Sequence, residues 1–199
     1  MAKAGRVPGI RSKESLAENA ARVVLFRLDE LLSWRAALHD PAAVEDSHNM
    51  RIAAKRLRYA LEAFEPCFPG TPPLLKDLTD IQEDLGTIHD LDVLTDLLLA
   101  RVHALDAPLV EQVTEIMRGD GTPGDKNRQV RSLLGSHARD AHRVGLYALA
   151  GEKIAERRRR FKRFADRWGG ERLDEFARGV RHLTEPEAVT EAVDQSASA

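Results

Sequence analysis

The chain has 199 residues, of which 43% are hydrophobic and 31% are charged, and its formal net charge is −2. This length suffices for one domain with a sizeable core or for two small fused bundles. The single cysteine, Cys67, excludes an intramolecular disulfide and a multi-cysteine metal site. Neither a signal-peptide core near the N-terminus nor an apolar run of about 18 residues is present, so we expect a cytoplasmic protein without a membrane segment.

Apolar residues recur at spacings of three and four, which is typical of helices, and no alternating strand pattern occurs. All nine prolines fall between the periodic segments, so each is expected to mark a helix boundary. In chain order, the predicted helices cover about 14–39, 42–65, 72–85, 88–105, 107–118, 126–168 and 171–183.

Local signals support several of these boundaries. The tetrapeptide SLAE, from Ser15 to Glu18, resembles a capping box at the first helix. Gly86 is expected to end the third helix, and if the segment 126–168 is interrupted, Gly145 and Gly151 are the expected positions. Gly169 and Gly170 end that segment. The short loops favour antiparallel neighbours in a helical bundle.

The predicted helix 42–65 separates cationic from apolar residues around its axis. Successive residues of a helix are rotated by about 100° around its axis. One side of the helix, about 100° wide, therefore carries His48, Arg51, Lys55, Arg58, Tyr59 and Glu62. The opposite side carries Met50, Ala53, Ala54, Leu57, Ala60, Leu61 and Phe64, while Arg56 lies between the two faces. A solvated surface usually mixes charge signs. Because Glu62 is the only acid in the cationic set, we favour an anion-binding face.

A second basic region lies in the predicted helix 126–168. Six of the seven residues from Arg157 to Arg163 are cationic, and an apolar seam runs through Phe161, Phe164 and Trp168. Beside this seam lie Lys153, Arg160, Arg163 and Arg167, and near its edge lie Arg157 and the upstream residues Arg139, His142 and Arg143. Arg158 and Lys162 point away and are interpreted as solvated.

The acidic segment 77–96 contains seven carboxylates and neither lysine nor arginine. Asp90 and Asp92 are expected to orient arginines of the basic helices. Lys76, just before this segment, is expected to join the cationic surface.

Two motifs together resemble the CHAD family, the conserved histidine α-helical domain. The first consists of His48, Arg51, Lys55, Arg56, Leu57 and Arg58, and the second of Leu85, Gly86, Asp90, Asp92 and Val93. The resemblance implies an all-α pair of antiparallel helical bundles with an internal pseudo-twofold and a basic cavity that binds inorganic polyphosphate. It also implies association with polyphosphate granules.

On this resemblance, residues 14–183 form a single CHAD-like domain, with a first bundle at about 14–105 and a second at about 107–183. Residues 1–13 and 184–199 are expected to be flexible. The second half has no copy of the first motif, and the chain lacks the E-x-E-x-K motif of the triphosphate-tunnel domain, so a stand-alone module is expected.

The predicted polyphosphate-binding residues come partly from the motif and partly from helical geometry. They are His48, Arg51, Lys55, Arg56, Arg58, Tyr59, Lys76, Arg139, Arg143, Lys153, Arg157 and Arg160. Arginine is suited to this ligand because its guanidinium makes bidentate contacts with phosphate oxygens.

Two other functions stay open. One is a helical adaptor or a module that binds a nucleic-acid backbone, although few aromatic platforms and the net charge make nucleic acid a less suitable ligand. The other is a phosphoryl-transfer or polyphosphate-processing enzyme, for which no P-loop or nucleophile motif is present. We expect no enzymatic activity, no cofactor and no metal.

Overall fold

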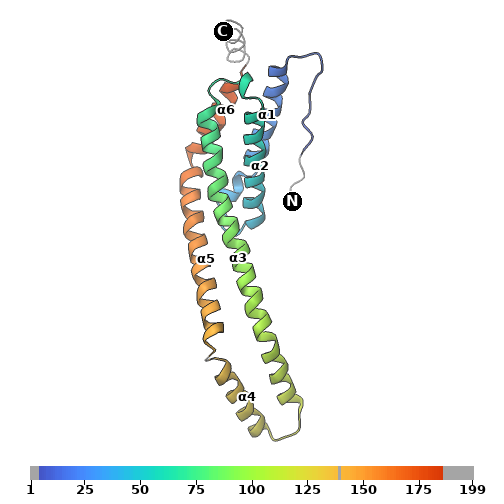
Figure 1. Ribbon diagram of the computed structural model, residues 1–199, viewed down its shortest axis with the longest axis vertical. Coiled ribbons are helices and arrows are strands. Elements are labelled where there is room, and N and C mark those ends of the chain that lie inside the picture. The colour runs from blue at the N-terminus through green and yellow to red at the C-terminus, as the bar shows by residue number, and fades with distance from the viewer. Residues whose placement is uncertain (1–4, 139, 186–199) are drawn as a thin grey trace. The chain divides into compact units, whose positions relative to one another are not determined.

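A computed structural model describes residues 5–138 and 140–185. Within these ranges the protein consists of six α-helices and two short 3-10 helices without any strand, which confirms the all-α prediction (Figure 1). The elements are α1 (Leu16–Ser33), η1 (Arg35–Leu38), α2 (Val44–Ala63), η2 (Glu65–Cys67), α3 (Thr71–Arg118), α4 (Pro123–His137), α5 (Ala141–Trp168) and α6 (Glu171–Leu183). In this described part of the chain, no helix combines the length and apolarity needed to cross a membrane.

The chain folds into two compact units. Among the described residues, unit 1 combines residues 5–89 with 158–185, and unit 2 consists of residues 90–138 and 140–157. Both α3 and α5 contribute residues to each unit. The predicted bundles, by contrast, follow one another in the sequence, and their pseudo-twofold stays a prediction.

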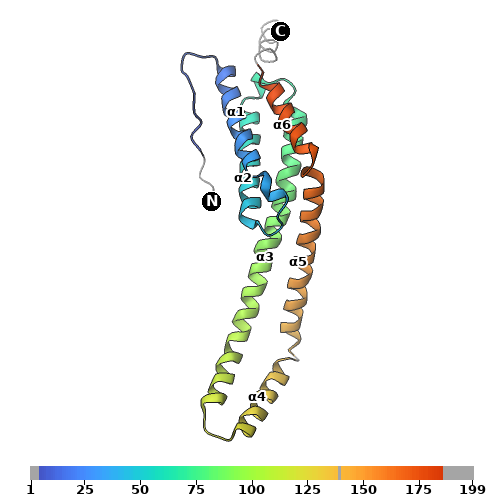
Figure 2. The same cartoon turned by 180° about the vertical axis from the view of Figure 1, so that it is seen from behind.

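The core of unit 1 is built from α1, α2, η1, the start of α3, the end of α5 and α6. In it, α1 packs against α2 and also contacts α6 (Figure 1 and Figure 2). The largest fully buried side chains all belong to this unit and are Trp168, Phe68, Phe164, Leu28, Leu31, Leu38, Met50, Leu57, Leu61, Leu78, Ile81 and Leu85.

The first helix begins where its capping signal predicts. The Ser15 hydroxyl accepts from the backbone N–H of Glu18, and the Glu18 carboxylate accepts from the backbone N–H of Ser15 at 2.8 Å. The helix ends at Ser33 rather than near 39, and η1 follows it. Residues 5–13 were expected to be flexible, yet the Gly5 backbone contacts the side chains of Glu30 and Arg27 on α1.

The prediction of three helices over 72–118 is wrong, because α3 is continuous from Thr71 to Arg118. Gly86 does not end a helix, since the adjacent Leu85 and Ile88 are buried and their packing outweighs a glycine cost of about 1 kcal/mol. Pro108 lies inside α3, so the rule that every proline marks a boundary also fails. The inward-facing Leu105 and Leu109 are half-buried on either side of it and continue the packed face.

The long segment 126–168 is interrupted between the end of α4 at His137 and the start of α5 at Ala141, and not at Gly145 or Gly151. Asp140 supplies the reason, because its carboxylate accepts from the backbone N–H of His142 at 3.0 Å and so caps the start of α5. The prediction placed the break at glycines and missed this cap.

The last predicted helix, 171–183, matches α6 in both bounds, and α5 ends just before Gly169 as expected. The inner face of α6 contains the buried residues Leu173, Phe176 and Val180. Most of the C-terminal segment that was predicted to be flexible lies outside the described residues.

Candidate anion-binding site

The amphipathic character predicted for α2 is present in the structure. Met50, Ala54, Leu57 and Leu61 have no exposed surface and belong to the core of unit 1. Phe64, just after the helix, is partly buried against the same core. Because one side of α2 is committed to packing, its other side is available for charged groups.

His48 starts the cationic face and contacts a second histidine. Its ring centroid lies 4.6 Å from that of His89 on α3, at an interplanar angle of 44°. Its Nδ1 is buried and has no hydrogen-bond partner within the described residues. Burial lowers the pKa of His48, and the charges of His89 and Arg51 lower it further, whereas Glu45 acts in the opposite direction. The neutral imidazole is therefore favoured in the free protein.

Arg51 lies three residues after His48, on the same face of α2. Its Nε is buried, and within the described part of the chain it has no hydrogen-bond partner. A buried donor without a partner costs stability. This nitrogen atom is thus an unsatisfied donor on the same face as His48.

Tyr59 organises the next two cations. The Lys55 Nζ lies 5.5 Å from the Tyr59 ring centroid, and the Arg58 Cζ lies 5.1 Å from it. The quadrupole of an aromatic ring attracts cations at such distances. The two positive groups are therefore held beside one exposed ring, although their charges repel each other.

Two arginines of α2 contact carboxylates. Arg56 lies 3.8 Å from Glu30 on α1, which agrees with its predicted position between the two faces. Arg58 pairs with Glu62 at 3.1 Å, the only acid of the cationic face, while its Nε is buried without a hydrogen-bond partner among the described residues. Arg58 thus retains one donor for a ligand.

The apolar seam predicted in α5 is confirmed, because Phe161, Phe164 and Trp168 are all buried in the core of unit 1. Arg160 is partly buried beside this seam. Lys162 pairs with Asp166 at 2.7 Å in an exposed position, as expected for a solvated residue.

Three predicted site residues of unit 2 are paired with carboxylates. Arg157 is buried and donates to both oxygens of Asp92, at 2.8 and 3.4 Å. Arg143 pairs with Asp106 at 3.1 Å. Lys153 pairs with Glu156 at 3.0 Å. The expectation that Asp92 orients an arginine is therefore confirmed.

Among the described residues, Asp90 and Lys76 have no such ion pair. Asp90 and Lys76 are exposed, and Arg139 lies outside the described residues. Lys76 precedes His89 by thirteen residues in α3, which corresponds to about 20 Å along the helix. Only an extended ligand would reach both residues.

The structure thus brings together five of the twelve predicted ligands on one helix face in unit 1. The face of α2 defined by His48, Arg51, Lys55, Arg58 and Tyr59 is called the α2 cationic face below. His89 adjoins it and was missed by the sequence analysis. Its position immediately before Asp90, inside the second motif, is the signal that pointed to it.

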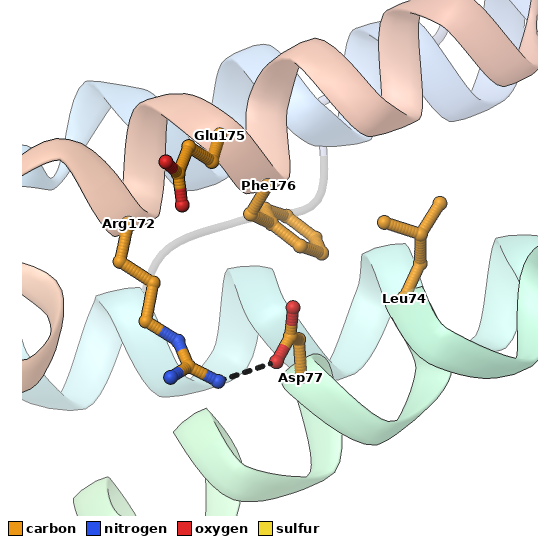
Figure 3. Close-up of a pocket in the computed structure, with 5 residues that line it drawn as sticks. All are labelled: Leu74, Asp77, Arg172, Glu175 and Phe176. Carbon is orange, nitrogen blue, oxygen red and sulfur yellow. Dashed lines mark hydrogen bonds and ion pairs between the residues drawn. The ribbon is translucent and has the colours of Figure 1, made fainter.

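A surface cavity of about 350 Å³ in unit 1 lies elsewhere. It is lined by Leu74, Asp77, Arg172, Glu175 and Phe176, and Arg172 pairs with Asp77 at 2.9 Å across it (Figure 3). None of the predicted site residues lines this cavity. Its paired charges also leave no cationic excess for an anion, so the α2 cationic face is the stronger candidate.

Comparison with known proteins supports the resemblance over the first half of the chain. The model of the CHAD domain family matches residues 5–99, which include α1, α2 and the first part of α3. No curated protein and no solved structure matches the chain. The matched range contains the whole α2 cationic face and His89.

Proposed function

We propose that the protein binds inorganic polyphosphate through the α2 cationic face, because the CHAD domain family model matches residues 5–99, which contain this face. One observation supports this proposal above the others. His48, Arg51 and Arg58 each hold a buried side-chain nitrogen that has no hydrogen-bond partner in the described ranges. All three side chains extend from the same face of one helix, so a single chain of oxyanions would satisfy them together.

The chemistry of the face suits a linear phosphate polymer. Each phosphate carries about one negative charge and offers only oxygen acceptors, which match the donors of arginine, lysine and histidine. The single exposed aromatic residue of the face, Tyr59, is already engaged with Lys55 and Arg58. A binder of single-stranded nucleic acid presents aromatic side chains on which bases stack.

The proposed roles differ along the face. Arg51 and Lys55 are the main phosphate ligands, because no carboxylate contacts the first through an ion pair in the described structure and the second is exposed. His48 adds a hydrogen bond, and a charge when protonated. Arg58 contributes its Nε, and Tyr59 positions the cations.

The cations of unit 2 have a secondary role in this proposal. Arg143, Lys153 and Arg157 already have carboxylate partners, so a phosphate would have to replace Asp106, Glu156 or Asp92. Arg56, Lys76, Arg139 and Arg160 stay predicted ligands. The function we propose is binding, with association with polyphosphate granules as its cellular consequence, and not phosphoryl transfer.

A titration with polyphosphates of defined length tests the proposal, with orthophosphate, ATP and duplex DNA as controls. We expect affinity to increase with chain length and to fall steeply with salt, by analogy with counterion release from nucleic acids. Polyphosphate should displace DNA far more readily than DNA displaces polyphosphate. An affinity independent of salt, or a preference for DNA, would contradict the proposal.

A double charge reversal locates the site. Arg51→Glu with Lys55→Glu should abolish polyphosphate binding and leave the helical circular dichroism intact. The matched control is Arg158→Glu with Lys162→Glu, which changes the net charge equally at two exposed residues of α5. If both double variants lose affinity equally, binding depends on overall charge and the α2 cationic face is not the site.

A further inference from the structure

Unit 2 buries few of its apolar side chains. Its buried hydrophobic residues are Leu91, Leu98, Val102 and Ala150. Of the thirteen exposed large hydrophobic residues in the described chain, nine belong to this unit: Val93, Leu94, Leu97, Val110, Met117, Leu134, Val144, Tyr147 and Leu149. Small units with so little internal core commonly depend on association for stability.

Within unit 2, α3 and α5 run antiparallel. Asp92 pairs with Arg157, and Asp106, further along α3, pairs with Arg143, which lies earlier in α5. The side of α3 that carries Leu91, Leu98 and Val102 is buried, and on α5 Ala150 is buried. These residues define the inward direction of each helix.

Five of the exposed side chains turn to one side of that inward direction. On α3, Val110 and Met117 are rotated about the helix axis by about 80–100° from the buried stripe, in the direction of increasing residue number. On α5, Tyr147 and Val144 are rotated by about 60–120° from Ala150 in the same sense. For antiparallel helices, the same sense of rotation leads to the same side of the pair. Leu134 of α4 lies about 40° from the half-buried Val130, again in that sense.

The start of α4 is tied to the end of α3, because Lys126 donates to the Met117 carbonyl at 3.0 Å. The distal apolar face is therefore defined as Val110, Met117, Leu134, Val144 and Tyr147. It combines residues from all three helices of the unit.

The Asp106 carboxylate beside this face is neutralised. The Tyr147 hydroxyl donates to Asp106 at 3.1 Å, and Arg143 neutralises the same carboxylate. A symmetric dimer brings one patch against an identical patch, so it requires a surface that does not repel itself. A charged partner protein would gain little here, whereas a second copy of the chain meets the requirement.

We infer that the distal apolar face of unit 2 is the contact through which two copies of this chain associate. At roughly half exposure, five large apolar side chains present about 300 Å² per copy and about 600 Å² in two copies. Specific interfaces are about 56–65% apolar. The apolar centre therefore corresponds to an interface of about 1,000 Å², at the lower end for specific complexes.

Sedimentation velocity of the full chain over a series of concentrations tests this inference. The wild-type protein should reach twice its chain mass of 22.1 kDa at tens of micromolar. Val110→Glu should remove the dimer at the same concentrations, because each copy would bury a carboxylate in an apolar contact. Since Val110 is 64% exposed, the variant should keep its helical circular dichroism.

Leu97→Glu is the matched control. Leu97 is also 64% exposed on α3, but it lies about 140° away from Val110 around the helix. This variant should dimerise like the parent. A monomeric wild type, or equal loss of the dimer in both variants, would overturn the inference.

Discussion

The two compact units differ in how they satisfy their apolar side chains. Unit 1 holds every one of the largest fully buried side chains, including Trp168, Phe164 and Leu57, whereas unit 2 fully buries few of its large apolar side chains and leaves nine exposed. The difference shows that one helix, α3, can contribute to a closed core in one part and to an exposed surface in another. In its first part α3 supplies a closed core, and in its second part it supplies a surface.

The units also differ in how they treat cations. Arg157 of unit 2 donates to Asp92 through its Nε and Nη2, while Arg51 of unit 1 has a buried Nε without a hydrogen-bond partner in the described structure. Paired arginines stabilise the free protein. An arginine without a partner is better explained by a ligand that the free protein lacks.

Truncation of core and surface leucines should give the largest contrast between the units. Leu57→Ala in unit 1 is expected to lower the free energy of unfolding by about 2–5 kcal/mol, because the side chain is fully buried. Leu97→Ala in unit 2 should change it by no more than about 0.5 kcal/mol, as is usual for exposed sites. Urea denaturation measures both values, and equal losses would contradict the difference between the units.

Removal of arginines should sharpen the second comparison. Arg157→Ala is expected to cost about 1.5–3 kcal/mol, since it leaves the half-buried Asp92 carboxylate without its charged donor. Arg51→Ala should be neutral or slightly stabilising in the absence of ligand, because it removes a buried unpaired donor.

A double-mutant cycle between Arg157 and Asp92, followed by chemical denaturation, isolates the pair. A coupling energy near zero would show that the ion pair contributes nothing, and the contrast with Arg51 would then disappear.

The smallest effect concerns pH and His48. Its pKa in the folded protein is lowered, mainly by burial, so at acidic pH the unfolded chain binds a proton that the folded protein resists. The stability contributed by the neutral imidazole is fully present above the unfolded value of about 6.5 and is lost as pH falls toward the lower folded value. Thermal unfolding between pH 5 and 8, as rough limits, should show this loss in the parent and less of it in His48→Gln.

Polyphosphate affinity should change in the opposite direction, because an anion favours the protonated imidazole. Binding is expected to strengthen as pH falls below about 6.5, and His48→Gln should flatten the dependence. The exposed His142 provides a control through His142→Gln. An identical pH profile for both variants would exclude His48 as the source.

Periodicity and capping signals predicted much of unit 1. The buried and cationic faces of α2, the start of α1 at Ser15 and both bounds of α6 follow from local sequence. In these places, local preference and tertiary packing agree. The pairing of Asp92 with a basic helix was also predictable. The segment 77–96 has seven acids and neither lysine nor arginine, whereas the predicted helix 126–168 has an excess of arginine.

The errors lie where packing outweighs local preference. Gly86 and Pro108 are poor helix residues, but the apolar stripe of α3 continues past both of them. The contact of His48 with His89 joins two helices, so no periodicity within either helix reveals it. The start of α5 depends on one carboxylate, that of Asp140, whose capping role was not distinguished from an ordinary surface acid.

The order of the units along the chain has a consequence for synthesis. The core of unit 1 needs side chains from α1 and from α6, and Arg35 pairs with Asp174, a partner 139 residues later. All of unit 2 leaves the ribosome between these two halves. Synthesis adds about 5–20 residues per second. The apolar faces of α1 and α2 would therefore stay exposed for several seconds before Phe164, Trp168 and Phe176 are synthesised. We therefore expect the core of unit 1 to close only after α6 has been synthesised, and nascent chains that end before α6 to require chaperone protection.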